Sequence, residues 1–233
     1  GQGVEQDYSK AVMWYRKAAI QGNVEGQFRL GVMYTKGWGV EKDYKKAAEW
    51  YRKVAEQGVS GVQFIVGAMY EKGDGVEQNY TEAAEWYRKA AEQGNATAQC
   101  KLGIMCEEGR GVEQNDAEAA TWYRRSADQN VPEAQFNLGI MYEEGRGVEQ
   151  NDIEATEWYR KAASQGIPAA QFKLGLRYEE GRGIERNNVR AAEWYQRAAE
   201  QGLADAQFNL GTMYYDGQGV EQDYSKAVMW YRK

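Results

Sequence analysis

Apolar and polar positions recur along the whole chain with a fixed period of 36 residues. A tryptophan followed by a tyrosine marks each copy. These tryptophans are Trp14, Trp50, Trp86, Trp122, Trp158, Trp194 and Trp230. A constant period of this length indicates an array of one repeated supersecondary unit. Because each unit of such an array packs only on its neighbours, we expect an extended surface and not an enclosed pocket.

Each repeat predicts two helices. In residues 24–58 a first apolar stretch, with Leu30 and Tyr34, ends at Gly37, as a helix does at a position that needs a positive φ. The stretch is about 13 residues long, or roughly 20 Å as a helix. A second stretch follows an Asp or Asn in every copy, the side chains that best cap a helix N-terminus. These caps are Asp7, Asp43, Asn79, Asn115, Asn151, Asn187 and Asp223. The chain therefore predicts six first helices and seven second helices, with no strand.

The end of the second helix supports this backbone assignment. It holds glycine in every copy but one, and the exception is Asn130, the other residue type that tolerates the left-handed region. Pro132 and Pro168 fall in the first turn of their first helices, where proline costs no hydrogen bond.

The two faces of the first helix differ in what they predict. Gly26, Leu30, Gly31 and Tyr34 share one side at 100° per residue, so we expect them to form the seam with the second helix. The glycine at position 31 is expected to let the two backbones approach closely. The tryptophan–tyrosine pairs of the second helices are expected in the core. The outer positions Glu49, Arg52, Lys53 and Glu56 are expected to form a solvated surface with i,i+4 ion pairs.

The opposite side of the first helix is apolar where a water-facing helix should be polar. All five phenylalanines lie there: Phe28, Phe64, Phe136, Phe172 and Phe208. The aliphatic or small residues beside them are Val32, Ala68, Ile104, Ile140 and Leu176. This ladder is interpreted either as a groove for a partner segment with apolar anchors or as packing between adjacent first helices.

An acidic rim follows the ladder in the middle repeats. It consists of Glu107, Glu108, Glu143, Glu144, Glu179 and Glu180. Arg110, Arg146 and Arg182 come next and are expected to neutralise part of it. The rim favours a partner with basic flanks, while charged turns of this kind are also common as plain solvated surface.

The repeat pattern resembles a known family. The string A-x-x-L-G-x-x-Y-x-x-G-x-G-V-x-x-D/N-x-x-x-A-x-x-W-Y-x-K-A-A-x-x-G is similar to the Sel-1-like repeat, a relative of the tetratricopeptide repeat. Val66, Cys106 and Thr156 are minor departures from it. The resemblance implies an all-α, right-handed α/α superhelix (solenoid) of about six helix-turn-helix repeats, with the first helices lining the concave face. It also implies an adaptor or scaffold, such as those found in bacterial signalling, envelope assembly or toxin immunity. A cysteine-rich branch linked to β-lactam binding is not matched, because its cysteines are missing here.

Composition narrows the chemistry. The formal net charge is −6, which disfavours a nucleic-acid partner. The chain has no histidine, and we find no candidate catalytic residue, metal ligand set or cofactor site. Cys100 and Cys106 are too far apart along one helix for a disulfide, and we expect two small buried side chains. No apolar run is long enough for a transmembrane helix. The compartment stays open: a periplasmic or secreted bacterial location fits if a signal peptide has been removed.

We therefore expect residues 1–233 to be one array, beginning and ending within a repeat, that binds a partner protein on its concave face without enzymatic activity. Residues 1–17 and 217–233 are the same string, and Met13 and Ile20 place apolar groups at outward positions. This identity has two interpretations. The chain is a window of a longer array, or it is a structural rod that assembles head to tail through its identical terminal units.

Overall fold

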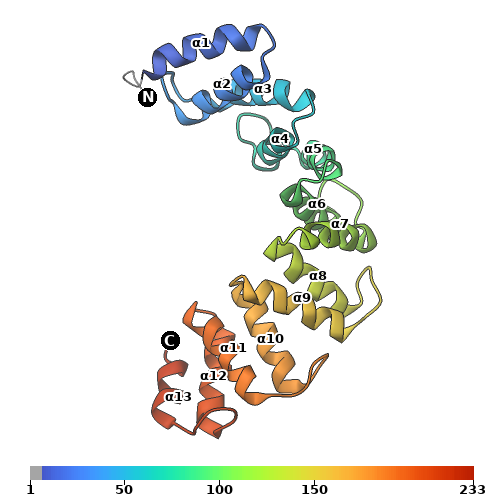
Figure 1. The fold of residues 1–233 in the computed structure, drawn as a ribbon, viewed down its shortest axis with the longest axis vertical. Helices are drawn as coiled ribbons and strands as arrows, with labels where there is room; N and C mark the ends of the chain where they lie inside the picture. The colour runs from blue at the N-terminus through green and yellow to red at the C-terminus, as the bar shows by residue number, and fades with distance from the viewer. Residues whose placement is uncertain (1–6) are drawn as a thin grey trace. The chain divides into compact units, whose positions relative to one another are not determined.

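The computed structural model describes residues 7–233, and every regular element in that range is an α-helix. The chain divides into two compact units, residues 1–115 and 116–233. Figure 1 labels the helices of both units in chain order. The first unit contains α1 (Tyr8–Ile20), α2 (Val24–Lys36), α3 (Tyr44–Glu56), α4 (Ser60–Lys72), α5 (Tyr80–Glu92) and α6 (Ala96–Glu108). The second contains α7 (Asp116–Asp128), α8 (Pro132–Glu144), α9 (Asp152–Ser164), α10 (Pro168–Glu180), α11 (Asn188–Glu200), α12 (Ala204–Asp216) and α13 (Tyr224–Tyr231).

The N-terminal caps predicted from the sequence are confirmed at Asp7, Asp43, Asn79, Asn151, Asn187 and Asp223. The Asp43 carboxylate accepts a hydrogen bond from the Lys46 backbone N–H at 2.9 Å, which satisfies a donor that the helix leaves free. Gly37 ends α2 with φ of 72°, and Asn130 is the single non-glycine residue with positive φ among those described, at 63°. Pro132 and Pro168 are the first residues of α8 and α10. The alternation of first and second helices therefore follows from local sequence.

The seam between first and second helices is buried as expected, with Leu30 fully buried and Tyr51 5% exposed. The glycine in the seam makes room for a tyrosine ring as well as for the neighbouring backbone. A Cβ on Gly31 would lie 2.7 Å from the ring of Tyr51, and one on Gly67 would also lie 3.2 Å from the backbone carbonyl oxygen of Ala83. The same relation recurs between Gly67 and Tyr87, Gly139 and Tyr159, Gly175 and Tyr195, and Gly211 and Tyr231.

A ladder of glutamines links successive repeats, and the sequence pattern did not reveal it. Buried Gln27 donates from Nε2 to the carbonyl of Ala19 at 3.2 Å, and its Oε1 accepts from Gln57 at 2.8 Å. Further glutamine pairs are Gln93 with Gln63, Gln165 with Gln135, and Gln201 with Gln171. Because both ends of each buried amide are satisfied, the ladder fixes the register of neighbouring helix pairs without leaving an unpaired polar group.

The tryptophans lie at the outer edge of the core. Trp86, Trp122, Trp158 and Trp230 are buried, whereas Trp14 is 62% exposed, contrary to expectation. Trp14 lies on α1, which has no helix before it among the described residues. A basic side chain three residues later covers each ring, as Lys89 does over Trp86 at 4.1 Å. Lys53 likewise lies over Trp50, at 4.3 Å, and this cation–π contact was not among the ion pairs expected on that surface.

Candidate protein-binding face

We call the side of the first helices that carries the phenylalanine ladder the first-helix face. In the first unit it is formed by α2, α4 and α6, and in the second by α8, α10 and α12. The rings of Phe28, Phe64, Phe136 and Phe172 are half-buried, and Phe208 is 63% exposed. Ile104, Ile140 and Leu176 are also half-buried. Each unit thus presents a partly accessible apolar strip.

Each phenylalanine packs against a tyrosine of the following second helix. The ring centroids of Phe64 and Tyr87 are 5.5 Å apart, and those of Phe172 and Tyr195 are 5.7 Å apart. The same contact joins Phe28 to Tyr51, Phe136 to Tyr159 and Phe208 to Tyr231. One side of each ring therefore contributes to the core, and only the other side is free to meet a partner.

The face is hollowed beside two of these rings. In the first unit Phe64 and Ala68 line a cleft of about 220 Å³ with Thr35 of α2 and Tyr51 of α3. In the second unit Phe208 lines a smaller cleft of about 100 Å³ between α10 and α12. Both clefts are smaller than the roughly 300–1,000 Å³ of typical small-molecule pockets, so they suit side-chain anchors of a protein segment better than a small-molecule ligand.

In the second unit the first glutamate of each acidic pair is part of the fold. Tyr195 donates its hydroxyl hydrogen to Glu179 at 2.5 Å, and Tyr159 does the same to Glu143, which also pairs with Lys173 at 3.1 Å. Burial acts to raise the pKa of Glu143, but the hydrogen bonds from Tyr159 and Lys173 and the charge of Arg177 outweigh it and lower the pKa. This carboxylate therefore stays ionised at neutral pH.

Glu71 has the same role in the first unit, although it lies outside the acidic rim predicted from the sequence. Its carboxylate accepts from Tyr87 at 2.6 Å and pairs with Lys101 of the next first helix at 3.3 Å. Burial acts to raise its pKa, but the Tyr87 hydrogen bond and the Lys101 charge lower it overall. Burial and this hydrogen bond in turn raise the pKa of Tyr87 far above its usual range. The glutamate sixteen residues before the core tyrosine was the feature of the sequence that could have indicated this contact.

The second glutamate of each pair lies beside an arginine. Arg146 Nε is 2.6 Å from Glu144, Arg182 is 3.9 Å from Glu180, and Arg110 pairs with Glu108. The partial neutralisation expected from the sequence is thus confirmed at all three positions. The rim offers less uncompensated negative charge to a partner than its glutamate count suggests.

The helices of residues 7–233 repeat every 36 residues, and this repeat matches a known family along the chain. The model of the Sel1 repeat matches residues 1–23, 24–59, 61–95, 96–131, 132–167, 168–203 and 204–233. The chain belongs to the Sel1 repeat family. Its fold class is accordingly the all-α helical-repeat superhelix, and Sel1 repeats generally serve as non-catalytic modules of protein–protein interaction.

Solved structures agree with this assignment. A protective antigen of uropathogenic Escherichia coli with an SLR fold is 43% identical, with a TM-score of 0.94 over 100% of this chain and 50% of that one. A Sel1 repeat protein from Oxalobacter formigenes is 38% identical, with a TM-score of 0.85 over 96% of this chain and 91% of that one. A tetratricopeptide-repeat protein from Cytophaga hutchinsonii shares only the fold, at 14% identity and a TM-score of 0.56, covering 97% of this chain and 88% of that one. A comparison with curated proteins gives no match. This Sel1 array thus spans about half the length of the Escherichia coli relative.

One buried charge in this Sel1 array was not predicted from the sequence. Arg177 of α10 is 2% exposed and stands where the other first helices carry methionine, for example Met141 and Met213. Its guanidinium lies 3.0 Å from Glu143 and 2.6 Å from Asp152. The lone Arg at an otherwise methionine position was the sequence signal for this network.

The array shows little other chemistry in the part that the structure describes. Between residues 7 and 233, no three His, Cys, Asp or Glu side chains gather in a group that could hold a metal ion. Cys100 and Cys106 are buried in α6, as expected of small apolar side chains. In the same range no helix combines the length and apolar character needed to cross a bilayer.

Proposed function

We propose that this Sel1 array is a non-enzymatic scaffold that binds a segment of a partner protein along its first-helix face. The single observation that carries the proposal is the ladder itself: apolar side chains recur every 36 residues on a face where a solvated helix would be polar, and they remain partly accessible. The packing on the core tyrosines accounts for one side of each phenylalanine ring, and the proposal concerns the side that remains accessible.

The geometry supports apolar anchoring more than charge recognition. The clefts beside Phe64 and Phe208 suit single side-chain anchors, and the repeated spacing favours an extended or helical segment with anchors at intervals. Basic flanks on that segment remain part of the proposal. They would meet Glu108, Glu144 and Glu180 only by displacing the neighbouring arginines, so they should contribute less than the anchors.

The test uses substitutions that leave the phenylalanine–tyrosine contacts in place. Phe136 and Phe172 pack on core tyrosines, so their replacement would also weaken the fold. Ile140→Glu with Leu176→Glu places two charges on the first-helix face instead. The matched control is Ile153→Glu with Val189→Glu, which places the same charges on α9 and α11 at side chains that are 65% and 55% exposed.

The wild type and both double variants serve as bait for proteins of the source cell. A protein retained by the wild type and the control variant but lost from Ile140→Glu/Leu176→Glu supports the proposal and identifies the partner. Equal retention by all three baits contradicts it, provided that circular dichroism shows unchanged helix content in each.

Head-to-tail assembly stays an alternative prediction. Of the identical strings 1–17 and 217–233, residues 1–6 lie outside the described residues. Met13 and Ile20 on α1 are 46% and 73% exposed, and Met229 on α13 is 43% exposed. Outer helices of any repeat array leave such positions uncovered, so this exposure does not favour self-association over partner binding. A concentration-dependent rise in mass that Met13→Glu and Met229→Glu abolish would favour it.

A further inference from the structure

A groove on the other side of the first unit, between the second helices α3 and α5, is larger than either cleft of the first-helix face. Its volume is about 770 Å³, and Val66, Met69 and Tyr70 of α4 form its floor. The sequence predicts only a solvated surface here. The groove has an apolar base and charged walls, which is the composition of a side-chain binding site and not of plain solvated surface.

Two local features leave this groove open. The corresponding groove between α7 and α9 is about 330 Å³, and Leu138 occupies the floor position that Val66 holds here. There Arg124 donates a hydrogen bond to the Tyr142 hydroxyl, and in the first repeat Arg16 likewise donates to Tyr34 at 2.8 Å.

Arg52 occupies the same position on α3 but donates to Glu56 at 3.1 Å, away from the groove. The hydroxyl of Tyr70 has no hydrogen-bond partner among the described residues. The smaller floor residue and the direction taken by Arg52 both open the groove.

The groove also lacks the cation that equivalent grooves supply to their tyrosine. Lys46 lies over the ring of Tyr34 at 5.5 Å, Arg190 over Tyr178 at 5.6 Å and Lys226 over Tyr214 at 5.1 Å. Those three cations share one repeat position, which in the α3–α5 groove is occupied by Glu82. In the described part of the chain no cation covers the Tyr70 ring.

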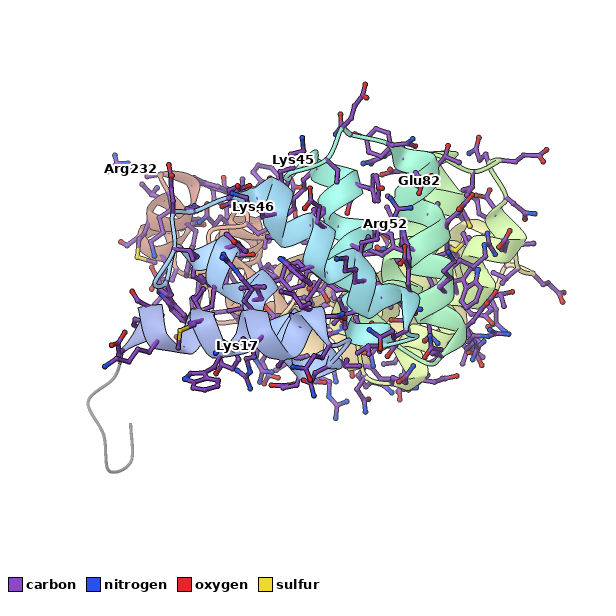
Figure 2. All side chains as sticks on the ribbon, turned by 90° about the horizontal axis from the view of Figure 1, so that it is seen from above. Lys17, Lys45, Lys46, Arg52, Glu82 and Arg232 are labelled. Carbon is purple, nitrogen blue, oxygen red and sulfur yellow. The ribbon has the colours of Figure 1, made fainter. Side chains whose placement is uncertain are left out.

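The walls carry an excess of carboxylate. Glu49 of α3, Glu77 of the loop and Glu82 of α5 line the groove, and none forms an ion pair with any residue that the structure describes. Two cations also line the groove. Arg52 pairs with Glu56, whereas Lys45 forms no ion pair with a described residue. Figure 2 labels three of the lining residues, Lys45 and Arg52 on α3 and Glu82 on α5.

We propose that the α3–α5 groove is a second docking site, distinct from the first-helix face, that takes an arginine side chain presented by a partner protein. The aliphatic part of the arginine would lie on Val66 and Met69, as such stems do on apolar surface. Its guanidinium would cover the Tyr70 ring and meet Glu82, so that it replaces the internal cation of the neighbouring grooves.

The test follows the Met69 methyl group by NMR in protein labelled at its methionine methyls, while the other methionines report on the rest of the fold. Because Met69 lines the Phe64 cleft as well as this groove, the groove variant described below assigns the signal to one of them. The probe is the peptide acetyl-Gly-Arg-Leu-Arg-Gly-amide, and the matched peptide carries glutamate in place of both arginines. We expect a saturable shift of the Met69 signal with the arginine peptide, with a dissociation constant below about 5 mM, and none with the glutamate peptide.

The variant Val66→Leu with Glu82→Lys gives this groove the residues of the first one, Leu30 and Lys46, and should raise the dissociation constant at least about tenfold. Glu154→Lys makes the same charge change at the equivalent position of α9 and should leave the constant within about twofold. The proposal is overturned if Met69 does not shift, if the glutamate peptide binds equally, or if Val66→Leu/Glu82→Lys binds as the wild type does. Glu82→Lys alone, a change at the surface, replaces the double variant in this comparison if the latter folds poorly.

Discussion

The guanidinium of Arg177 contacts the carboxylate of Asp152 at 2.6 Å while only 2% of the arginine side chain is exposed. Other copies of the repeat hold methionine and, most often, tyrosine at these two positions, as Met33 and Tyr8 do. An apolar pair has thus been replaced by a charged one at one point of the second unit. Such a buried charge is tolerated only while its partners remain, because an unpaired charge in the interior is very costly.

We expect Arg177→Met to lower the free energy of unfolding of the second unit by about 1–3 kcal/mol, because it leaves Glu143 and Asp152 without their shared cation. The lower part of the range allows for the partial exposure of Asp152. Adding Asp152→Tyr restores the side chains of the first repeat and should recover most of that loss. Urea unfolding of the wild type, both single variants and the double variant measures the coupling. An Arg177→Met protein as stable as the wild type would show that the ion pairs contribute nothing.

Acid should weaken the network around Glu143. Its pKa is lowered in the folded protein, so the unfolded chain binds a proton more readily, and the stabilisation is complete above the unfolded pKa of about 4.5. It is lost as the pH falls through the lowered folded value. We therefore expect Glu143→Gln to be less stable than the wild type at pH 7 and the difference to shrink below pH 4.5. Urea midpoints measured from pH 7 to pH 3 test this, and a difference that grows in acid would show that folding raises this pKa instead.

The seam glycines should tolerate no added methyl group. In Gly31→Ala the new Cβ would lie 2.7 Å from the Tyr51 ring, and we expect a loss of about 1–3 kcal/mol from the strain. Gly61→Ala in α4 is the control, since a Cβ there meets nothing within 4 Å. It should be neutral or stabilise by up to about 1 kcal/mol, because alanine favours the helix. Thermal unfolding of both variants measures the contrast, and equal melting temperatures would refute the proposed tyrosine fit.

The glutamine ladder should be sensitive to loss of a single amide. Gln171 donates to the Ala163 carbonyl at 3.2 Å and accepts from Gln201 at 2.8 Å. Gln171→Leu removes both of these hydrogen bonds from a buried position, so we expect a loss of about 1–3 kcal/mol in the free energy of unfolding. Gln196→Ala, which removes an exposed glutamine of α11, should change stability by less than about 0.5 kcal/mol. The same chemical denaturation applies to both, and similar losses would mean that the ladder does not hold the repeats together.

Local features of the fold were predictable because they depend on a few adjacent residues. The cap at Asp43, the left-handed Gly37 and the exceptional Asn130 follow from backbone chemistry alone. The fit of the Tyr51 ring against Gly31 could not be predicted in this way, because it depends on residues that are twenty positions apart in the sequence. The hydrogen bond between Tyr87 and Glu71 likewise forms only once the two helices have packed.

The candidate sites likewise have features that could be predicted from the sequence and features that could not. The phenylalanine ladder is visible as a periodic violation of helix amphipathicity, so its position could be predicted, but its contacts with the core tyrosines could not. The α3–α5 groove depends on one floor residue, Val66, and on the direction taken by Arg52. The direction of the Arg52 side chain depends on which of two competing acceptors, Glu56 or the Tyr70 hydroxyl, binds it more strongly. The pattern of residue types in the sequence does not show which acceptor is preferred.

Photo-crosslinking shows most directly whether a partner protein binds on the first-helix face. A photoreactive phenylalanine analogue at position 140 would lie on that face, and the same analogue at position 153 would lie on the exposed surface of α9. After irradiation in an extract of the source cell, we predict one discrete crosslinked protein from position 140 and none from position 153. Crosslinking of the same protein from position 153 but not from position 140 would place the partner elsewhere and refute binding on the first-helix face.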